Sequence, residues 1–335
     1  MASPGAENMV VKPFAGVRGK RRAGEQRLDA RPPKRVNKNG SQKKQAKVRR
    51  PKASNIEKSM PLEILERIFW LSENVNFPRA APRLGRLLSG PSTLRETFLS
   101  AFGPRGSFGW EDDLDRFGGN PGFQTDILAC SWATIDVILN CRDIWVRRHA
   151  RNLPFQYFPL WGDPMSPSPY MGSGVTVGIS EIKEARCYFY HDYNAFRNIE
   201  RQSAYSGYLT ERNPNTWIDV HRSTEIPDDL IVGPWDEGSL QKFFWLVQAG
   251  ARLSSGQTWE VTHEGFRNAI SDYHIPNLTI IRLLDILGAF QKWPQYIRKD
   301  ECNTIDPVMA ISKRENDTTL YEKYTYVKSL LLDHE

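Results

Sequence analysis

The chain has few of the residues that stabilise disulfide-rich or metal-binding proteins. Its 335 residues include only four cysteines, and no two of them form a Cys-x-x-Cys pair. This spacing excludes a dense disulfide framework and argues against a zinc ribbon. The six histidines show no His-Glu-x-x-His spacing. We therefore expect neither a metal site nor a cofactor. We interpret the cysteines as reduced core thiols, at Cys130, Cys141, Cys187 and Cys302.

Long apolar segments are also missing. The longest apolar run, Ile280 to Phe290, contains Arg282 and Asp285 and is too short to span a bilayer. No apolar stretch follows Met1, so nothing resembles a secretory signal peptide. We expect an intracellular protein without a membrane-spanning segment.

Motifs of enzymatic chemistry are missing as well. Gly172-Ser173-Gly174 with Gly178 superficially suggests a phosphate-binding loop, but the segment contains neither Gly-Lys-Ser/Thr nor a full Gly-x-Gly-x-x-Gly. His191-Asp192 and the scattered serines give no set of nucleophile, base and orienting group. We therefore expect a turn at 172–178, no catalytic residues and no enzyme.

Apolar residues and basic residues are abundant, and the basic ones are unevenly distributed. Apolar residues make up 40% of the chain and aromatics 11%, which is enough to fill a core. Residues 1–58 hold 17 Lys and Arg against 4 Asp and Glu, a charge of +13 in a chain whose total is +6. The remainder of the chain therefore carries −7.

Residues 1–55 are predicted to be a disordered basic arm. Gly, Pro, Gln, Asn and Ser separate its basic clusters, and the arm cannot bury enough apolar surface to offset backbone entropy. Paired basic clusters predict a nuclear-import signal, an import receptor as partner, and a nuclear or nucleocytoplasmic location. The alternative is a solvated tail that contacts nucleic-acid phosphates weakly. The candidate import residues are Lys20, Arg21, Arg22, Lys34, Arg35, Lys43, Lys44, Arg49 and Arg50.

Residues 56–103 are predicted to form a compact unit of three helices. In the first helix, from Met60 to Leu71, apolar side chains cover an arc of about 180°, whereas a one-sided surface helix needs about 100°. The arc consists of Leu62, Ile64, Leu65, Ile68, Phe69 and Leu71. Further helices are predicted at 80–88 and 93–102, the last opened by a Thr93 and Glu96 capping box. Either the chain covers both sides of the first helix, or one side meets a partner protein.

This unit resembles the F-box. The string Met60-Pro61-Leu62-Glu63-Ile64-Leu65-x-x-Ile68-Phe69 is similar to the opening of that motif, and the sequel from Asn76 to Gly85 resembles the variant common in fungal F-box proteins. The resemblance implies a non-catalytic substrate receptor that binds a Skp-type adaptor and, through it, the cullin of a ubiquitin ligase. The client protein is unknown. The positions that match the family's adaptor contacts are Met60, Pro61, Leu62, Leu65, Ile68 and Phe69.

The rest of the chain completes a mainly α prediction. Residues 104–235 are predicted to be a mixed middle region, with helix at 123–150 and a small β element made by Val175–Val177 and Arg186–Tyr190.

Residues 236–335 are predicted to be helical, with Asp236 as the cap of the first helix. Phe243 to Ala251 resembles the second helix of an ankyrin repeat, which commonly ends in Gly-Ala. Ile281 to Ala289 has the same Gly-Ala ending 38 residues later. Val327 to Glu335 resembles these two segments but lacks the Gly-Ala. None of them carries the Thr-Pro-Leu-His opening, so degenerate ankyrin-like repeats and ordinary helical hairpins both stay open.

Overall fold

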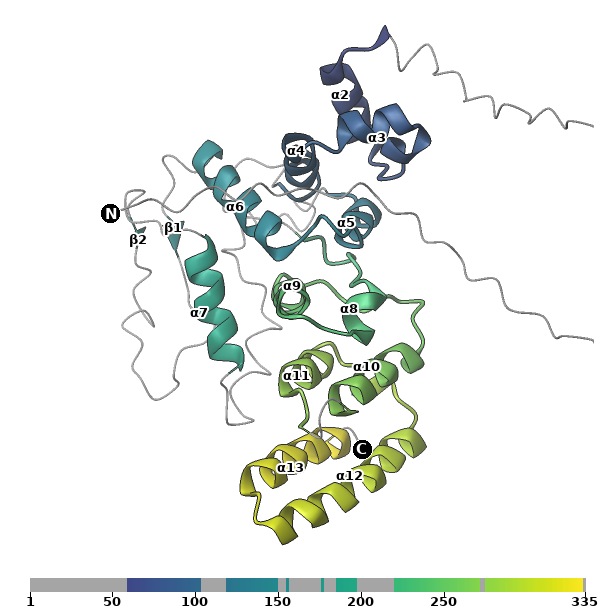
Figure 1. Cartoon of the computed structure of the whole chain (residues 1–335), viewed down its shortest axis with the longest axis vertical. Coiled ribbons are helices and arrows are strands. Elements are labelled where there is room, and N and C mark those ends of the chain that lie inside the picture. Colours follow the sequence, from purple (N-terminus) through teal and green to yellow (C-terminus); the bar gives the residue numbers. More distant parts are fainter. Residues whose placement is uncertain are drawn as a thin grey trace, which may run out of the picture. The chain divides into compact units, whose positions relative to one another are not determined.

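The computed structural model describes residues 59–103, 119–149, 155–156, 176–177, 185–197, 220–271 and 275–333. All of these belong to one compact unit, Lys52–Glu335. Within it the protein is mainly helical, as predicted (Figure 1). The basic arm with its nine candidate import residues lies outside the described residues.

Helices make up nearly all of the regular structure in the described part. The α-helices are α2 Leu62–Ser72, α3 Pro82–Leu88, α4 Pro91–Phe102, α5 Pro121–Leu128, α6 Ile135–His149, α7 Ala185–Arg197, α8 Asp228–Val232, α9 Glu237–Gln248, α10 Trp259–Ser271, α11 Leu278–Ile286, α12 Gln295–Glu315 and α13 Thr318–Leu332. Short 3-10 helices are η1 Phe77–Ala80 and η5 Phe290–Lys292. The two-residue strands β1 Phe155–Gln156 and β2 Thr176–Val177 pair in antiparallel fashion.

The strand predicted at Arg186–Tyr190 is wrong, because this segment lies in α7 and the partner of β2 is β1. Phe189, Tyr193 and Phe196 are spaced at i, i+4 and i+7, so they lie on one face of α7. All three rings contact the ring of Phe244 on α9, with centroids 5.0 to 5.9 Å apart. The burial of this aromatic face outweighs the β propensity of the individual residues.

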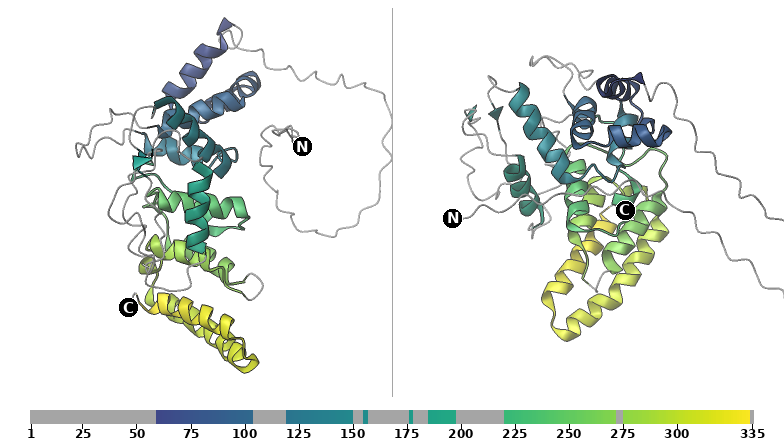
Figure 2. Two further views of the ribbon diagram at one scale, coloured as in Figure 1. Left: turned by 90° about the vertical axis from the view of Figure 1, so that its left-hand side faces the viewer. Right: turned by 45° about the horizontal axis from the view of Figure 1, so that its top comes forward.

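The C-terminal helices form a stack of three helical hairpins, α8–α9, α10–α11 and α12–α13 (Figures 1 and 2). In this stack α8 packs on α10, and α11 lies between α9 and α13. The predicted helix after Asp236 is confirmed, since the Asp236 carboxylate accepts a hydrogen bond from the Ser239 backbone N–H at 2.7 Å. α9 is buried on every side from Gln241 to Gln248, so it forms the centre of the structure.

α9 and α11 end in the same way. Gly250 and Gly288 have positive φ angles of 86° and 67°, a conformation that glycine adopts without strain. The backbone N–H of the following Ala251 donates to the Leu246 carbonyl, and that of Ala289 donates to the Leu284 carbonyl, both at 3.0 Å. Each helix is therefore closed by a Schellman motif.

Buried apolar side chains form two separate clusters in the described part of the chain. The larger one extends from α4 to α13. The smaller one, here called the small core, lies between α2 and α3 and consists of Leu65, Phe69, Leu84 and Leu88. Phe98, Ala101 and Phe102 of α4 belong to the larger cluster, so α4 is built into the main body of the protein.

Candidate docking surface

The first described helix, α2, has a well-defined start and end. Pro61 occupies its N-cap position, and the fixed φ of proline suits a helix start. Glu73 ends the helix in the left-handed conformation, with φ 48°. Between these residues the side chains of α2 point in three directions, each with a different environment.

One face of α2 builds the small core. Leu65 is 0% exposed and Phe69 is 3% exposed, and both pack against Leu84 and Leu88 of α3. The Phe69 ring stacks on Phe77 with centroids 6.3 Å apart. This apolar contact holds α2 and α3 together as one small unit.

A second face of α2 makes hydrogen bonds to α4 and to the start of α5. The Thr93 hydroxyl donates to the Glu66 carboxylate at 2.6 Å, and the Trp70 indole N–H donates to the Thr97 hydroxyl at 3.1 Å. At the end of α2, the Asn120 side-chain amide donates to the Glu73 carboxylate at 2.8 Å. We call these three contacts the polar seam.

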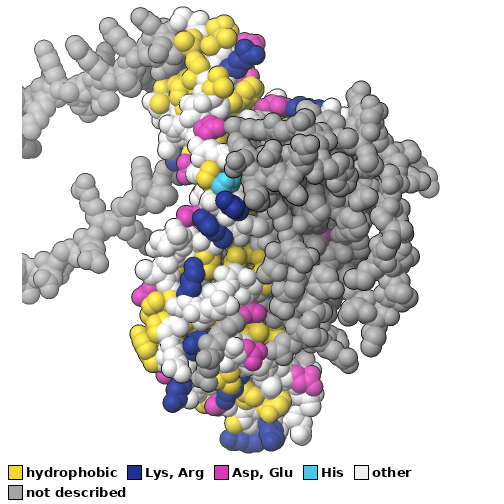
Figure 3. Space-filling view, turned by 180° about the vertical axis from the view of Figure 1, so that it is seen from behind, with side chains coloured by type: hydrophobic (Ala, Val, Ile, Leu, Met, Phe, Trp, Pro, Cys, Tyr) yellow, Lys and Arg dark blue, Asp and Glu magenta, His cyan; other side chains and the backbone are white. Residues whose placement is uncertain are grey.

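The third face of α2 is apolar and open to solvent. Leu71 is 82% exposed and Ile64 44%, and Ile68 between them is half-buried. We call Ile64, Ile68 and Leu71 the α2 stripe. Leu62, which is 39% exposed, lies on the opposite side of the helix. Ile64, Ile68 and Leu71 follow i, i+4 and i+7 spacing and so share one side of the helix. Seen from behind, hydrophobic side chains are visible at the end of the molecule where α2 and α3 lie (Figure 3).

The structure separates the six predicted adaptor-contacting residues into two groups. Pro61 and Leu62 are exposed, and Met60 and Ile68 are partly exposed. Leu65 and Phe69 are buried in the small core, so they support α2 from inside and do not form its outer surface. Sequence reasoning placed Ile64 and Leu71 in the apolar arc but not among the contact residues, although they are the most exposed members of the arc.

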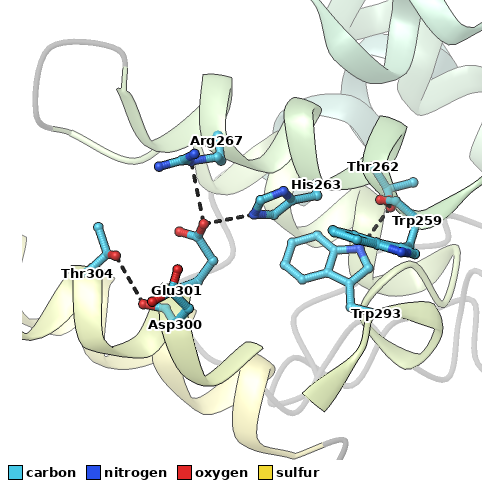
Figure 4. A network of polar contacts seen from close by, with 8 residues as sticks. All are labelled: Trp259, Thr262, His263, Arg267, Trp293, Asp300, Glu301 and Thr304. Carbon is cyan, nitrogen blue, oxygen red and sulfur yellow. Dashed lines mark hydrogen bonds and ion pairs between the residues drawn. The ribbon is translucent and has the colours of Figure 1, made fainter. Parts of the chain in front are cut away.

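A polar cluster elsewhere in the described part of the chain joins α10 to α12 (Figure 4). His263 Nε2 lies 2.8 Å from a carboxylate oxygen of Glu301, and Arg267 Nε lies 3.5 Å from the same oxygen. The Trp293 indole N–H donates to the Thr262 hydroxyl at 2.9 Å. Thr304 donates to the backbone carbonyl of Asp300 within α12. These contacts satisfy a buried carboxylate and join two hairpins of the stack.

The described residues contain no group of three or more His, Cys, Asp or Glu side chains with the arrangement of a metal site. In the same residues, no helix combines the length and apolarity needed to cross a bilayer. Comparisons of the chain with protein-family models, curated proteins and solved structures find no match.

Proposed function

We propose that the chain is a non-catalytic substrate receptor of the F-box kind, which docks through α2 on a Skp-type adaptor and thereby on a cullin. The observation that carries this proposal is that two faces of α2 have different environments. One face holds the helix to α3, and on another face Ile64 and Leu71 of the α2 stripe are exposed within the described part of the chain. The F-box-like string Met60 to Phe69 makes up most of this helix and its start.

The spacing of the α2 stripe is that of a helix which enters an apolar groove of a partner. Such helices are recognised through anchors at i, i+3, i+4 and i+7. A few buried apolar anchors supply most of the binding energy of a typical interface. Burying Leu71 and Ile64 would remove the two most exposed apolar side chains of α2 from water, which is favourable in proportion to the area buried.

The experiment is a binding titration of the full chain with a purified Skp-type adaptor. Replacing Ile64→Asp together with Leu71→Asp places charges in the proposed interface, and we expect the affinity to fall at least about a hundredfold. The matched control is Leu332→Asp on α13, because Leu332 is 43% exposed and Ile64 is 44% exposed. We expect the control to bind like the unaltered chain.

Leu65 is unsuitable as a test position. It is fully buried, so Leu65→Asp would disrupt the small core, and the loss of binding would not show where the partner sits. Unchanged affinity of the Ile64 and Leu71 double variant would contradict the proposal. Equal losses of adaptor affinity in the double variant and in Leu332→Asp would also contradict the proposal, because they would show that any added charge weakens binding.

The client would then bind to the C-terminal stack. The identical endings of α9 and α11, 38 residues apart at Gly250 and Gly288, support a degenerate ankyrin-like repeat. The loops that precede α8 and α10 are also joined, by a parallel bridge between Glu225 and Arg252. Repeats of this kind usually present extended surfaces to protein partners.

A second candidate function follows from the charge of the N-terminal segment. Residues 1–58 carry +13, a charge that attracts nucleic-acid phosphates without sequence preference. We expect any such binding to single-stranded RNA or DNA to weaken steeply between 50 and 200 mM salt, and to vanish when residues 1–55 are deleted. Binding that survives the deletion would place the contact elsewhere and remove this candidate.

A further inference from the structure

α4, α5 and the C-terminal stack are tightly joined. The buried Gln124 side chain donates to the Ala101 carbonyl at 2.7 Å and accepts from the His221 backbone N–H at 2.8 Å and the Thr224 hydroxyl at 2.6 Å. Lys242 Nζ on α9 donates to the Leu128 carbonyl at the end of α5 at 2.6 Å. These hydrogen bonds accompany one continuous apolar core, so this part behaves as a single body.

The unit formed by α2, η1 and α3 is attached differently. Its buried apolar side chains face each other in the small core. Within residues 59–88, Val75 is the one apolar side chain that packs on the larger cluster. The side-chain hydrogen bonds of the polar seam link this unit to α4 and to the start of α5. When the seam opens, each of these hydrogen bonds is exchanged for one to water, so its net contribution to stability is modest.

The covalent link on the α3 side is short and free of helix. Ser89 and Gly90 separate the end of α3 from the start of α4, and Gly90 has an extended backbone with φ −64° and ψ 142°. A glycine between two helices can absorb a large change in backbone angles. The position of Gly90 is therefore suited to a hinge.

We infer that α2, η1 and α3 open as a unit from α4 and α5 by breaking the polar seam, with Ser89 and Gly90 as the hinge. This inference deepens the proposed function, because the opening sets the direction in which the α2 stripe points relative to the client-binding stack. A receptor with such a joint can bring clients of different sizes to one adaptor. The purpose of the joint depends on the proposed function, whereas its existence does not.

Distances between spin labels test the joint in the full chain, after Cys130 and Cys187 have been replaced by serine. One pair of labels is placed at Arg86→Cys on α3 and Glu264→Cys on α10, both exposed positions. The control pair joins Ser92→Cys on α4 to the same site on α10. We expect two distance populations for the first pair and one for the control pair.

Two variants then remove the same hydrogen bond of the polar seam from opposite sides, Thr97→Val and Trp70→Phe. Each should raise the ratio of the open to the closed population about fivefold, the factor expected for one net hydrogen bond. The control is Thr325→Val on α13, because Thr325 donates to the carbonyl four residues earlier as Thr97 does and lies outside the polar seam. It should leave the ratio unchanged.

A single distance for the first pair, unaffected by both seam variants, would overturn the inference. The inference would also be overturned if the distance distribution of the control pair were as broad as that of the first pair, because the motion would then not lie at the polar seam. The measurement needs no adaptor. Its failure is thus distinct from a failure of Ile64→Asp with Leu71→Asp to weaken adaptor binding.

Discussion

At the scale of single residues, Lys242 is a buried charge in the main body of the protein. Its side chain is buried in the middle of α9, and its ammonium group donates to the Leu128 carbonyl. This carbonyl lies at the C-terminal end of α5, where a cation is favoured by the helix dipole. Burial nevertheless lowers the pKa of Lys242 to about 8, because the charged form loses hydration.

The lowered pKa of Lys242 predicts a pH dependence of stability. Between pH 8 and about 10.5 the unfolded chain binds more protons at this lysine than the folded chain, so its contribution to the free energy of unfolding rises with pH. From pH 8 to about pH 10.5, we therefore expect the free energy of unfolding of the unaltered chain to rise relative to that of Lys242→Met. Urea denaturation at pH 8 and pH 10 measures it.

Cys141 titrates in the same range, and the comparison with Lys242→Met removes its contribution. Burial raises the pKa of Cys141 to about 12, an effect that lowers stability as the pH rises above 9. This thiol is present in both proteins, so its contribution cancels in the difference. A difference that stays constant from pH 8 to pH 10 would contradict a buried, charged Lys242.

The cysteines should differ sharply in reactivity. Cys141 is buried and its raised pKa keeps it in the thiol form, whereas Cys187 on α7 is exposed. We expect iodoacetamide at pH 8 to modify Cys187 first and to reach Cys141 only when the protein is unfolded in urea. Peptide mass spectrometry follows both sites. Similar rates at the two cysteines in the folded protein would show that the α6 environment is open to solvent.

At the scale of helices, the packing of α10 on α8 depends on Gly265. A Cβ atom at this position would collide with the backbone carbonyl of Ile231 on α8. We expect Gly265→Ala to lower the free energy of unfolding by about 1–3 kcal/mol, because overpacking forces the two helices apart. The control is Gly256→Ala, where a Cβ would meet nothing within 4 Å. Urea denaturation of both variants checks the prediction, and equal stability would contradict the close packing.

Helix signals that act over a few residues could be predicted from the sequence. Asp236 caps α9 as predicted, because the donor is only three residues away. The capping box of Thr93 and Glu96 is wrong, since α4 begins at Pro91 after Gly90 and shows no side-chain cap. Thr93 bonds instead to Glu66, and Glu96 forms a bidentate ion pair with Arg148 at 2.6 and 2.9 Å. These partners lie on other helices, and a local pattern contains no information about them.

The same limit applies to the candidate site. The wide apolar arc of α2 indicated more apolar surface than one neighbour can cover, and the exposed α2 stripe agrees with that expectation. Which half of the arc turns inward is decided by Leu84 and Leu88 of α3, and the spacing within α2 alone does not reveal it. Leu65 and Phe69 were therefore grouped with exposed positions such as Leu62.

At the scale of the whole molecule, charge separates the chain into two parts. Residues 1–58 carry +13 and the remainder −7, so the formal total of +6 describes neither part. The basic part is where an import receptor would bind. Among its clusters, Lys20-Arg21-Arg22 and Lys34-Arg35 are the first pair separated by a spacer.

We predict that the chain accumulates in the nucleus through these clusters. Alanine at Lys20, Arg21, Arg22, Lys34 and Arg35 should abolish nuclear accumulation of a fluorescent fusion, because the acidic groove of an import receptor loses its cationic ligands. Fluorescence microscopy measures the ratio of nuclear to cytoplasmic signal. Alanine at Lys299, Lys313 and Arg314 of α12 is the control. Loss of nuclear accumulation in the control variant alone would contradict an import signal in the basic clusters.

The Gln124 side chain also has a consequence for how the protein is made. Its amide oxygen bonds to His221 and Thr224, and Thr224 lies 100 residues further along the chain. Until that segment has left the ribosome, the oxygen cannot form these two hydrogen bonds. The early helices of a nascent chain therefore cannot close their final interior, and a message truncated before codon 224 should yield a product that chaperones retain and proteases remove.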